Sequence, residues 1–351
     1  MTPFRPVAGF IPPYLLDRII ERGSERQRAC ARGTLQHVRQ LRPNPGPPGL
    51  QARQAPAPGR PGQPQRHIHD AEQRMELPGV PRRSEGQAET GDAAVDEAYE
   101  ALGDTYRFFW DAYGRDSIDG RGFALIGTVH YGDGYENAFW NGEQMVFGDG
   151  DGEIFQRFTR ALEVVAHELA HGVIESEAAL VYVNQSGALN ESISDVFGVL
   201  TKQYRLGQRA DQADWLVGAG LLTERVRGRA LRSMAEPGSA YDDPLLGRDP
   251  QPAHMRDFIV TRDDNGGVHL NSGIPNRAFY LAATAIGGPA WERAGRIWYD
   301  TLLDRRLPND ADFATFAGLT LTQARARFGD ASAEARAVAE AWQTVGVEID
   351  P

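Results

Sequence analysis

The chain has 351 residues, a length that favours two domains and one additional segment. Its net charge of −11 argues against a nucleic-acid partner, and its 41% apolar content contains no run of 18 residues that suggests a membrane span. A single cysteine, Cys30, excludes an internal disulfide and a cysteine-ligated structural zinc site, so any metal must be held by histidines and carboxylates.

Residues 1–66 differ from the rest of the chain in charge and composition. They hold eleven arginines and three acidic residues, a net charge of +8, which leaves −19 for the remainder. Pro and Gly dominate residues 43–64, and this composition predicts an extended linker. A basic segment of this kind would favour association with an acidic partner domain.

One amphipathic helix is expected on this basic tether. Apolar residues between positions 15 and 20 form one helical face after Pro12-Pro13, and Gly23 is placed to end the helix. The two prolines also interrupt the only candidate for a signal-peptide core, so we expect no ordinary secretory signal.

The sequence after residue 67 predicts first a helix and then strands. Asp92 is a suitable N-cap for a helix that runs to Tyr113. The apolar period then changes to two, which predicts strands over residues 124–131, 137–140 and 144–147, separated by Gly-rich turns. The acidic run 148–152 lacks the ligand spacing of an EF-hand and is expected to be a turn.

An H-E-x-x-H motif, His167-Glu168-Leu169-Ala170-His171, lies in a stretch that predicts a helix over residues 155–173. Two histidines four residues apart share one helix face, so both imidazoles can bind one metal ion while Glu168 projects beside them. These residue types in this spacing indicate a zinc site with its own general base.

The rest of the chain is predominantly helical in pattern. Helices are predicted over residues 187–198, 210–222, 276–285, 291–303, 312–328 and 331–345. A β-rich first half and a helical second half would therefore meet at the metal-site helices.

A catalytic zinc needs three protein ligands and one open position. The metzincin pattern would require a glycine and a histidine where this chain has Ile174 and Glu177, so that pattern is excluded. Glu191, 24 residues after His167 and near the start of the next predicted helix, is the alternative third ligand.

Four motifs make the chain resemble the thermolysin family of zinc metalloendopeptidases. They are His167-Glu168-x-x-His171, Gly187-Ala188-x-Asn190-Glu191-x-Ile193-Ser194-Asp195, Leu231-Arg232-Ser233-Met234 and Asp264-Asn265-Gly266-Gly267-Val268-His269-x-Asn271-Ser272-Gly273. The resemblance covers most of residues 67–350. The segment Ile11-Pro12-Pro13-Tyr14-Leu15-Leu16 is similar to the short propeptides of the protealysin-like branch.

This resemblance implies an α+β fold with two domains and the active site in the cleft between them. The β-rich domain would span residues 67–183 and the helical domain residues 184–351, and residues 1–66 would be propeptide and linker. One Zn²⁺ per chain would be bound by His167, His171 and Glu191.

The family pattern also assigns roles around the zinc. Glu168 would take a proton from the water that the metal activates and pass it to the leaving amine. Asp195 would accept the free ring N–H of His167, and Asn190 that of His171, which fixes their tautomers.

A second group would act on the substrate carbonyls. His269 and Tyr182 would donate to the oxyanion of the tetrahedral intermediate, with Asp264 holding the His269 ring. Arg232 would bind the carbonyl beyond the scissile bond.

An edge strand and an apolar pocket would bind the substrate. The main chain of the strand that contains Asn137 and Ala138 would pair with an extended peptide. The pocket for a large aliphatic or aromatic residue after the scissile bond would be lined by Val164, Phe155, Phe158 and Leu231.

The chain departs from the family at thermolysin's paired calcium site. Lys202, Leu216 and Ala219 stand at ligand positions, while Glu163 and Asp214 are retained. A lysine repels a cation, so this calcium pair is predicted to be absent and any remaining dependence on calcium to be weaker.

The interpretation favoured by these residues is a zymogen of a zinc endopeptidase, a monomer that acts on proteins or peptides, with its own propeptide as a partner in cis and no membrane partner. One alternative is a metal-binding or peptide-binding protein without catalysis, and another is a zinc exopeptidase. A further hypothesis gives Cys30 the role of a thiolate ligand in the precursor. The family implies secretion, whereas the absence of a visible signal leaves cytoplasmic accumulation as the alternative.

Overall fold

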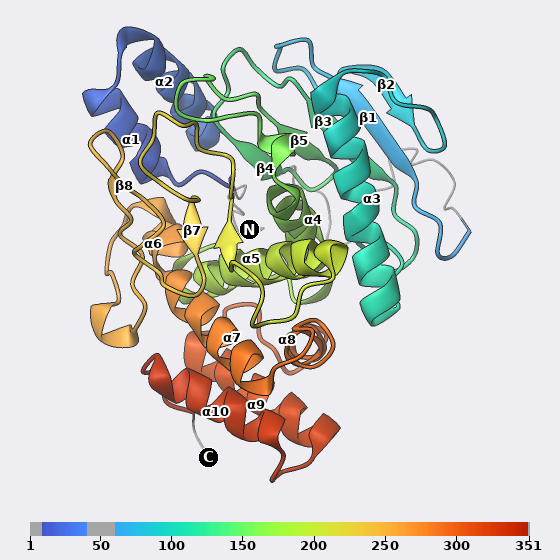
Figure 1. Ribbon diagram of the computed structural model, residues 1–351, viewed down its shortest axis with the longest axis vertical. Helices are drawn as coiled ribbons and strands as arrows, with labels where there is room; N and C mark the ends of the chain where they lie inside the picture. The colour runs from blue at the N-terminus through green and yellow to red at the C-terminus, as the bar shows by residue number, and fades with distance from the viewer. Residues whose placement is uncertain (1–8, 41–59, 350–351) are drawn as a thin grey trace, which may run out of the picture.

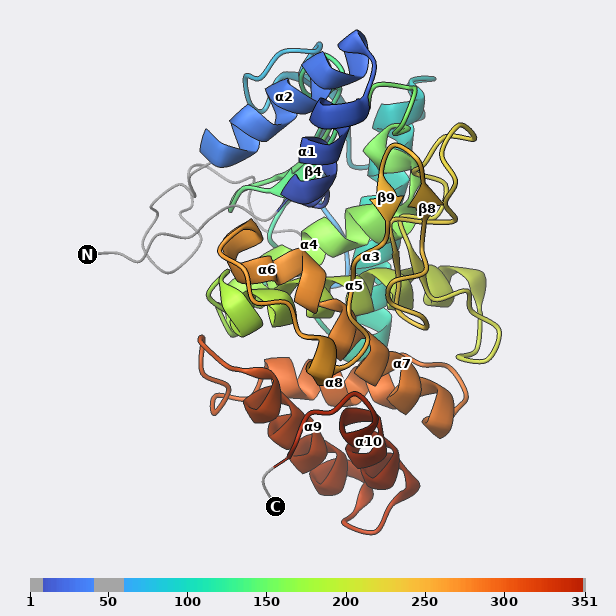
Figure 2. The same cartoon turned by 90° about the vertical axis from the view of Figure 1, so that its left-hand side faces the viewer.

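The computed structural model describes residues 9–40 and 60–349, and Figures 1 and 2 show their arrangement from two sides. The N-terminal stretch 1–8 and most of the predicted linker lie outside the described residues.

Two helices of the N-terminal segment pack against each other at one end of the molecule, drawn in blue in Figure 1. α1 (Pro13–Arg22) ends at Gly23 and buries Leu15, Leu16 and Ile19, as predicted. The prediction of a single helix is wrong, because α2 (Glu25–Gln40) follows directly. The arginine-rich sequence of α2 contains few large apolar residues, and packing against the rest of the chain stabilises it.

A five-stranded sheet forms the centre of the first half of the chain. Its order is β2-β1-β3-β5-β4, and β3 pairs in parallel with β1 and β5. The strands are β1 (Arg66–Asp70), β2 (Val80–Ser84), β3 (Leu125–Val129), β4 (Ala138–Trp140) and β5 (Met145–Phe147). α3 (Ala93–Tyr113) packs on this sheet, and its predicted N-cap, Asp92, accepts the backbone N–H groups of Ala94 and Val95. β4 is a sheet edge, and Gly9 forms a β-bridge with Phe139 there.

Two buried helices, α4 (Leu162–Glu177) and α5 (Asn184–Leu206), lie against each other below the sheet (Figure 1). A Cβ atom at Gly198 would lie 2.6 Å from the carbonyl oxygen of Glu163, so glycine permits this close approach. The predicted start of the first helix at Phe155 is wrong. Phe155 forms a β-bridge with Leu222, and a 3₁₀ turn (Phe158–Arg160) separates it from α4.

The C-terminal part is a layer of helices, drawn in orange to red in Figures 1 and 2. They are α6 (Asp264–Asn271), α7 (Gly273–Ile286), α8 (Ala294–Leu302), α9 (Phe313–Phe328) and α10 (Ala333–Thr344). The helix predicted over residues 210–222 is wrong, because β6 (Leu216–Val217) pairs with β7 (Arg232–Ser233) instead. A third short pair joins β8 (Asp242–Asp243) to β9 (Gly247–Arg248), and a 3₁₀ turn (Met255–Asp257) follows.

The predicted α+β architecture, with a sheet-containing first half and a helical second half, is confirmed. Among the described helices, none combines the length and apolar character that crossing a membrane requires.

Candidate active site

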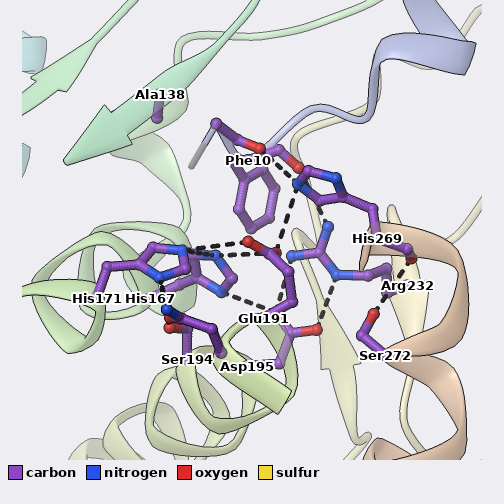
Figure 3. A network of polar contacts seen from close by, with 12 residues as sticks. Phe10, Ala138, His167, His171, Glu191, Ser194, Asp195, Arg232, His269 and Ser272 are labelled. Carbon is purple, nitrogen blue, oxygen red and sulfur yellow. Dashed lines mark hydrogen bonds and ion pairs between the residues drawn. The ribbon is translucent and has the colours of Figure 1, made fainter. Parts of the chain in front are cut away.

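The two helices α4 and α5 bring His167, His171 and Glu191 together in one buried cluster (Figure 3). One ligand atom from each lies within 4.8 Å of the others. The histidine Nε2 atoms are 3.5 and 3.4 Å from the Glu191 carboxylate, and all three side chains are buried. Burial would raise the pKa of Glu191, but His269, His171 and His167 lower it, so the group carries a negative charge.

The outer ring nitrogens of both histidines have acceptors. His167 Nδ1 is 2.9 Å from Asp195 Oδ1, and His171 Nδ1 is 2.8 Å from Asn190 Oδ1. Ser194 Oγ also lies 3.0 Å from His171 Nδ1, a contact that the sequence motifs did not predict.

This pattern fits a bound cation. If both Nδ1 atoms carry the proton, the two Nε2 lone pairs face each other at 3.0 Å beside a carboxylate. Burial and the neighbouring His167 lower the pKa of His171 to about 4, which keeps its ring neutral. Two neutral imidazoles and one carboxylate are a donor set that zinc accepts in catalytic sites.

Glu168 lies on the same helix, fully buried, and neither carboxylate oxygen has a side-chain hydrogen-bond partner in the described part of the chain. Burial and the nearby Glu191 raise its pKa well above the ordinary value. A carboxyl group with a raised pKa can accept and release a proton near neutral pH.

His269 enters the site from α6, the short helix directly before α7. Asp264, Asn265, Gly266 and Gly267 all have positive φ angles, so this Asp-Asn-Gly-Gly sequence reverses the chain within one turn. The turn places Asp264 Oδ1 at 2.6 Å from His269 Nδ1. Burial would lower the pKa of His269, but Asp264 and Glu191 raise it to about 9, so its Nε2 is a proton donor.

Tyr182 lies between α6 and the ligand cluster. Its hydroxyl donates to Glu191 Oε1 and is 3.2 Å from His269 Nε2. The predicted pair of donors, Tyr182 and His269, is therefore on one side of the histidine–carboxylate cluster.

Arg232 on β7 is fixed by a buried, bidentate pair with Asp195. The Nε and Nη2 atoms are 2.8 and 2.7 Å from the carboxylate, and Asn276 Nδ2 donates to the same group at 2.9 Å. Burial would raise the pKa of Asp195, but Arg232 and His167 keep it well below its usual range. Asp195 thus connects a zinc-site histidine to Arg232, a link that separate motifs could not reveal.

The segment Gly9–Ile11 passes directly over this site (Figure 3). His269 Nε2 donates to the Gly9 carbonyl at 2.7 Å, and Arg232 Nη1 donates to the Phe10 carbonyl at 3.2 Å. Phe10 N–H donates to the Ala138 carbonyl at 2.9 Å, and Ile11 N–H to Asn137 Oδ1 at 2.8 Å.

The Phe10 side chain is fully buried. Its ring lies 5.2 Å from the His167 ring, and the Arg232 guanidinium lies 4.4 Å from its centroid. Gly218 lies against both Phe10 and Leu231, which leaves room for the ring. Val164 and Phe155 are buried in the same core cluster, whereas the contribution of Gly218 was missed because a glycine in a loop carries no motif.

Cys30 lies elsewhere. Its sulfur contacts Gly134, and burial and Glu136 raise the pKa of its thiol. The hypothesis that Cys30 is a zinc ligand in the precursor is therefore wrong, because the segment over the metal site is Gly9–Ile11 on the other side of α1.

Comparisons with known proteins agree with this geometry. Three family models match: the thermolysin metallopeptidase catalytic domain over residues 71–175, its alpha-helical domain over 178–347, and the protealysin propeptide over 8–49. The chain is 59% identical to the extracellular metalloprotease of Pectobacterium carotovorum subsp. carotovorum over 98% of each chain. It is 48% identical to the protease PrtS of Photorhabdus sp. (strain Az29), over 97% of this chain and 92% of the relative.

A solved structure is also similar. The precursor of protealysin, a metalloproteinase from Serratia proteamaculans, superposes with a TM-score of 0.90 at 60% identity, over 97% of this chain and 100% of that one.

Proposed function

The chain belongs to the thermolysin family of metallopeptidases, and we propose that it cleaves internal peptide bonds before large apolar residues with His167, His171 and Glu191 as its zinc ligands. It is a zinc metalloendopeptidase made as a zymogen with a protealysin-type propeptide. The observation that carries the assignment of residues is the substrate-like position of Gly9–Phe10 over the His–His–Glu cluster.

A zinc ion held by His167, His171 and Glu191 would supply a Lewis acid that brings the pKa of water towards neutrality. Glu168 takes the proton of the attacking water on its carboxylate and gives it to the nitrogen of the leaving amine. A cation beside Glu168 favours its ionised form and offsets the effect of burial. Asp195 and Asn190 hold the two histidine rings in the orientation that points both Nε2 atoms at the metal.

His269 and Tyr182 stabilise the oxygen of the scissile carbonyl. The contact of His269 Nε2 with the Gly9 carbonyl supports this role. Asp264 keeps the His269 ring oriented and charged, so a donor is in place as negative charge develops. Arg232 binds the next carbonyl, as it binds that of Phe10.

By the same register, the residue after the scissile bond enters the pocket that Phe10 fills. Val164, Phe155 and Leu231 give this pocket its apolar character, and Gly218 gives it room for a ring. Asn137 and Ala138 bind the main chain of the substrate, as they bind Phe10 and Ile11. In the zymogen the segment Gly9–Ile11 occupies both the pocket and the edge strand, so a substrate is excluded from them.

We also propose that the family's paired calcium site is replaced by an ion pair. Lys202 Nζ is 3.5 Å from Glu163 and 3.0 Å from Asp214, and it donates to the Leu216 carbonyl at 3.0 Å. The ammonium group thus contacts the two carboxylates that the family's pattern leaves for calcium. Addition of calcium should leave the melting temperature of the protein unchanged, and two tightly bound calcium ions in the purified protein would refute this.

We assign residues 1–66 to the propeptide and linker, 67–183 to the β-rich domain and 184–351 to the helical domain. Two observations support this division. The match to the catalytic-domain family ends at residue 175 and the match to the helical-domain family starts at residue 178, and α5 starts at Asn184. We further propose that the enzyme acts outside the cell as a monomer, since similar proteins are named extracellular metalloproteases.

Peptides that are blocked at both ends test the function. The mature enzyme should cut them internally before Phe or Leu, lose this activity in a zinc chelator and regain it with added zinc. An exopeptidase would leave blocked peptides intact, and a binding protein without catalysis would leave every peptide intact.

A further inference from the structure

The segment from Tyr131 to Gln156 contains the substrate-binding strand β4 and carries only one sign of charge. It has six acidic residues and no Lys, Arg or His. Its acidic residues are Asp133, Glu136, Glu143, Asp149, Asp151 and Glu153. A region next to the cleft with a net charge of −6 attracts basic groups.

In the zymogen the arginine-rich helix α2 covers part of this segment. Thr34 Oγ1 accepts the backbone N–H of Glu136 at 3.0 Å, and Arg26 Nη2 donates to the Asp151 carbonyl at 3.3 Å. Gln27 Nε2 donates to Glu153 Oε2 at 3.0 Å. The basic helix α2 and the acidic segment from Tyr131 to Gln156 are complementary in charge. The three contacts above do not include an ion pair with Glu136.

Glu136 has no partner for its carboxyl group in the described part of the chain. The side chain is fully buried beneath α2, and neither oxygen makes a hydrogen bond. Asp151 is 3% exposed, and its Oδ2 also lacks a partner, although Oδ1 accepts three backbone N–H groups. Burial, and then the charge of Asp151, raises the pKa of Glu136 to about 9, so the group is neutral under the helix.

The bound segment shows where Glu136 lies relative to a substrate. Gly9 pairs with Phe139 in antiparallel fashion, and Phe10 donates to the Ala138 carbonyl. If the antiparallel pairing of Gly9 with Phe139 is extended by three residues, residue 12 lies opposite Glu136. Residue 12 is a proline, which offers no charge or donor to a carboxylate.

We propose that Glu136, with Asp151, forms an acidic subsite that selects a Lys or Arg side chain two residues beyond the residue in the Phe10 pocket. This inference rests on the proposed function, because it extends the substrate preference of the same cleft. When the propeptide leaves, water reaches Glu136 and the carboxyl group ionises. A basic substrate side chain then supplies the partner that Pro12 does not.

The expected preference is moderate, because the ion pair forms at a solvent-accessible edge of the cleft. Attraction of Arg and repulsion of Glu at this position should together change kcat/KM by about tenfold. High salt should reduce this ratio by screening.

The test uses the mature enzyme and three blocked peptides with Phe after the scissile bond. They differ only in the residue two positions beyond Phe, which is Arg, Ala or Glu. The wild type should cleave the Arg peptide about tenfold better than the Glu peptide by kcat/KM. Glu136→Gln should lower this ratio to about threefold, and Glu136→Lys should reverse the preference.

Glu143→Gln is the matched control, because it removes one charge from the same segment beyond the other end of β4, and it should keep the wild-type ratio. The Ala peptide reports whether each variant is folded and active. Equal kcat/KM for Arg and Glu peptides in the wild type, or an unchanged ratio in Glu136→Gln, would overturn the subsite. Failure of the wild type to cut any of the three peptides would instead count against the proposed function.

Discussion

The carboxylates that hold the site histidines, Asp195 and Asp264, and the carboxyl group of Glu136 beneath α2 are all largely buried side chains, but only the first two are paired. In the cluster, Asp195 has Arg232, His167 and Asn276 as partners, and Asp264 has His269. Beneath α2, Glu136 is buried without any partner in the described chain. Buried charges that have partners favour one permanent arrangement, because removal of a partner leaves a buried charge unpaired. A buried group without a partner makes it easier for the two surfaces to separate. The comparison separates permanent catalytic machinery from an interface that must come apart.

Among the variants that test this comparison, the largest effect is expected at His269, whose role belongs to the transition state. His269→Ala in the mature enzyme should lower kcat by about 100-fold to 1000-fold while KM changes little. Steady-state kinetics on a blocked peptide measure this. A rise in KM at constant kcat would instead indicate a role in substrate binding alone.

Asp195→Asn tests the permanent pairing in the cluster. The Asn side chain leaves Arg232 buried without its counter-charge, so the free energy of unfolding should fall by about 3 kcal/mol. Zinc affinity should fall by about tenfold or more, because the His167 ring loses its charged acceptor. Chemical denaturation measures the loss of stability, and competition with a chelator measures the loss of zinc affinity. A variant as stable as the wild type would contradict the role of Asp195 as the counter-charge of Arg232.

Phe10→Ala tests the interface at its apolar anchor. Removal of a fully buried ring should weaken docking of the propeptide by about 3 kcal/mol and raise the peptidase activity of the uncut precursor. Val38→Ala, a smaller change at a half-buried position of α2, is the control and should raise it much less. Latency that is unchanged in Phe10→Ala would show that another contact keeps the precursor inactive.

Glu136→Gln tests the unpaired acid through pH. The pKa of Glu136 is about 9 in the folded precursor against an ordinary value of 4.5, so the precursor holds a proton that the unfolded chain releases. Stability from this group is complete below pH 4.5 and is lost as pH rises towards 9.

Glu136→Gln should therefore become more stable relative to the parent by about 2 kcal/mol between about pH 6 and about pH 7.5. Denaturation of both proteins in a Glu168→Gln background avoids self-digestion. Burial lowers the pKa of His37, so its effect appears below its ordinary value of 6.5 and is common to both proteins. A difference in stability that does not vary with pH would contradict the buried position of a neutral Glu136.

The sequence predicted the parts of the site that depend on local spacing. The H-E-x-x-H helix and the contact of Asp264 with His269 each join residues a few positions apart, so short-range geometry determines them. The N-cap of α3 at Asp92 is a local feature of the fold in the same sense. The helix predicted at 210–222 failed because β6 pairs with a strand 15 residues further along the chain. No local pattern encodes that pairing.

The parts that were missed are contacts between distant segments. α2 carries little apolar patterning of its own, and its position depends on His37 packing against Tyr131, Tyr135 and Phe139. The contact of Phe10 with the zinc-site histidine spans more than 150 residues of sequence, and the isolated burial of Glu136 exists only when α2 is in place. Such features follow from the assembled fold and not from one segment.

The central claim, that Glu168 performs the proton transfer beside a zinc ion held by His167, His171 and Glu191, is tested most directly with the mature Glu168→Gln enzyme. We expect this variant to bind one zinc per chain, as in the wild type, and to have a kcat at least about 1000-fold lower on a blocked peptide. A Glu168→Gln enzyme that binds zinc and keeps its kcat within about tenfold of the wild type would contradict it.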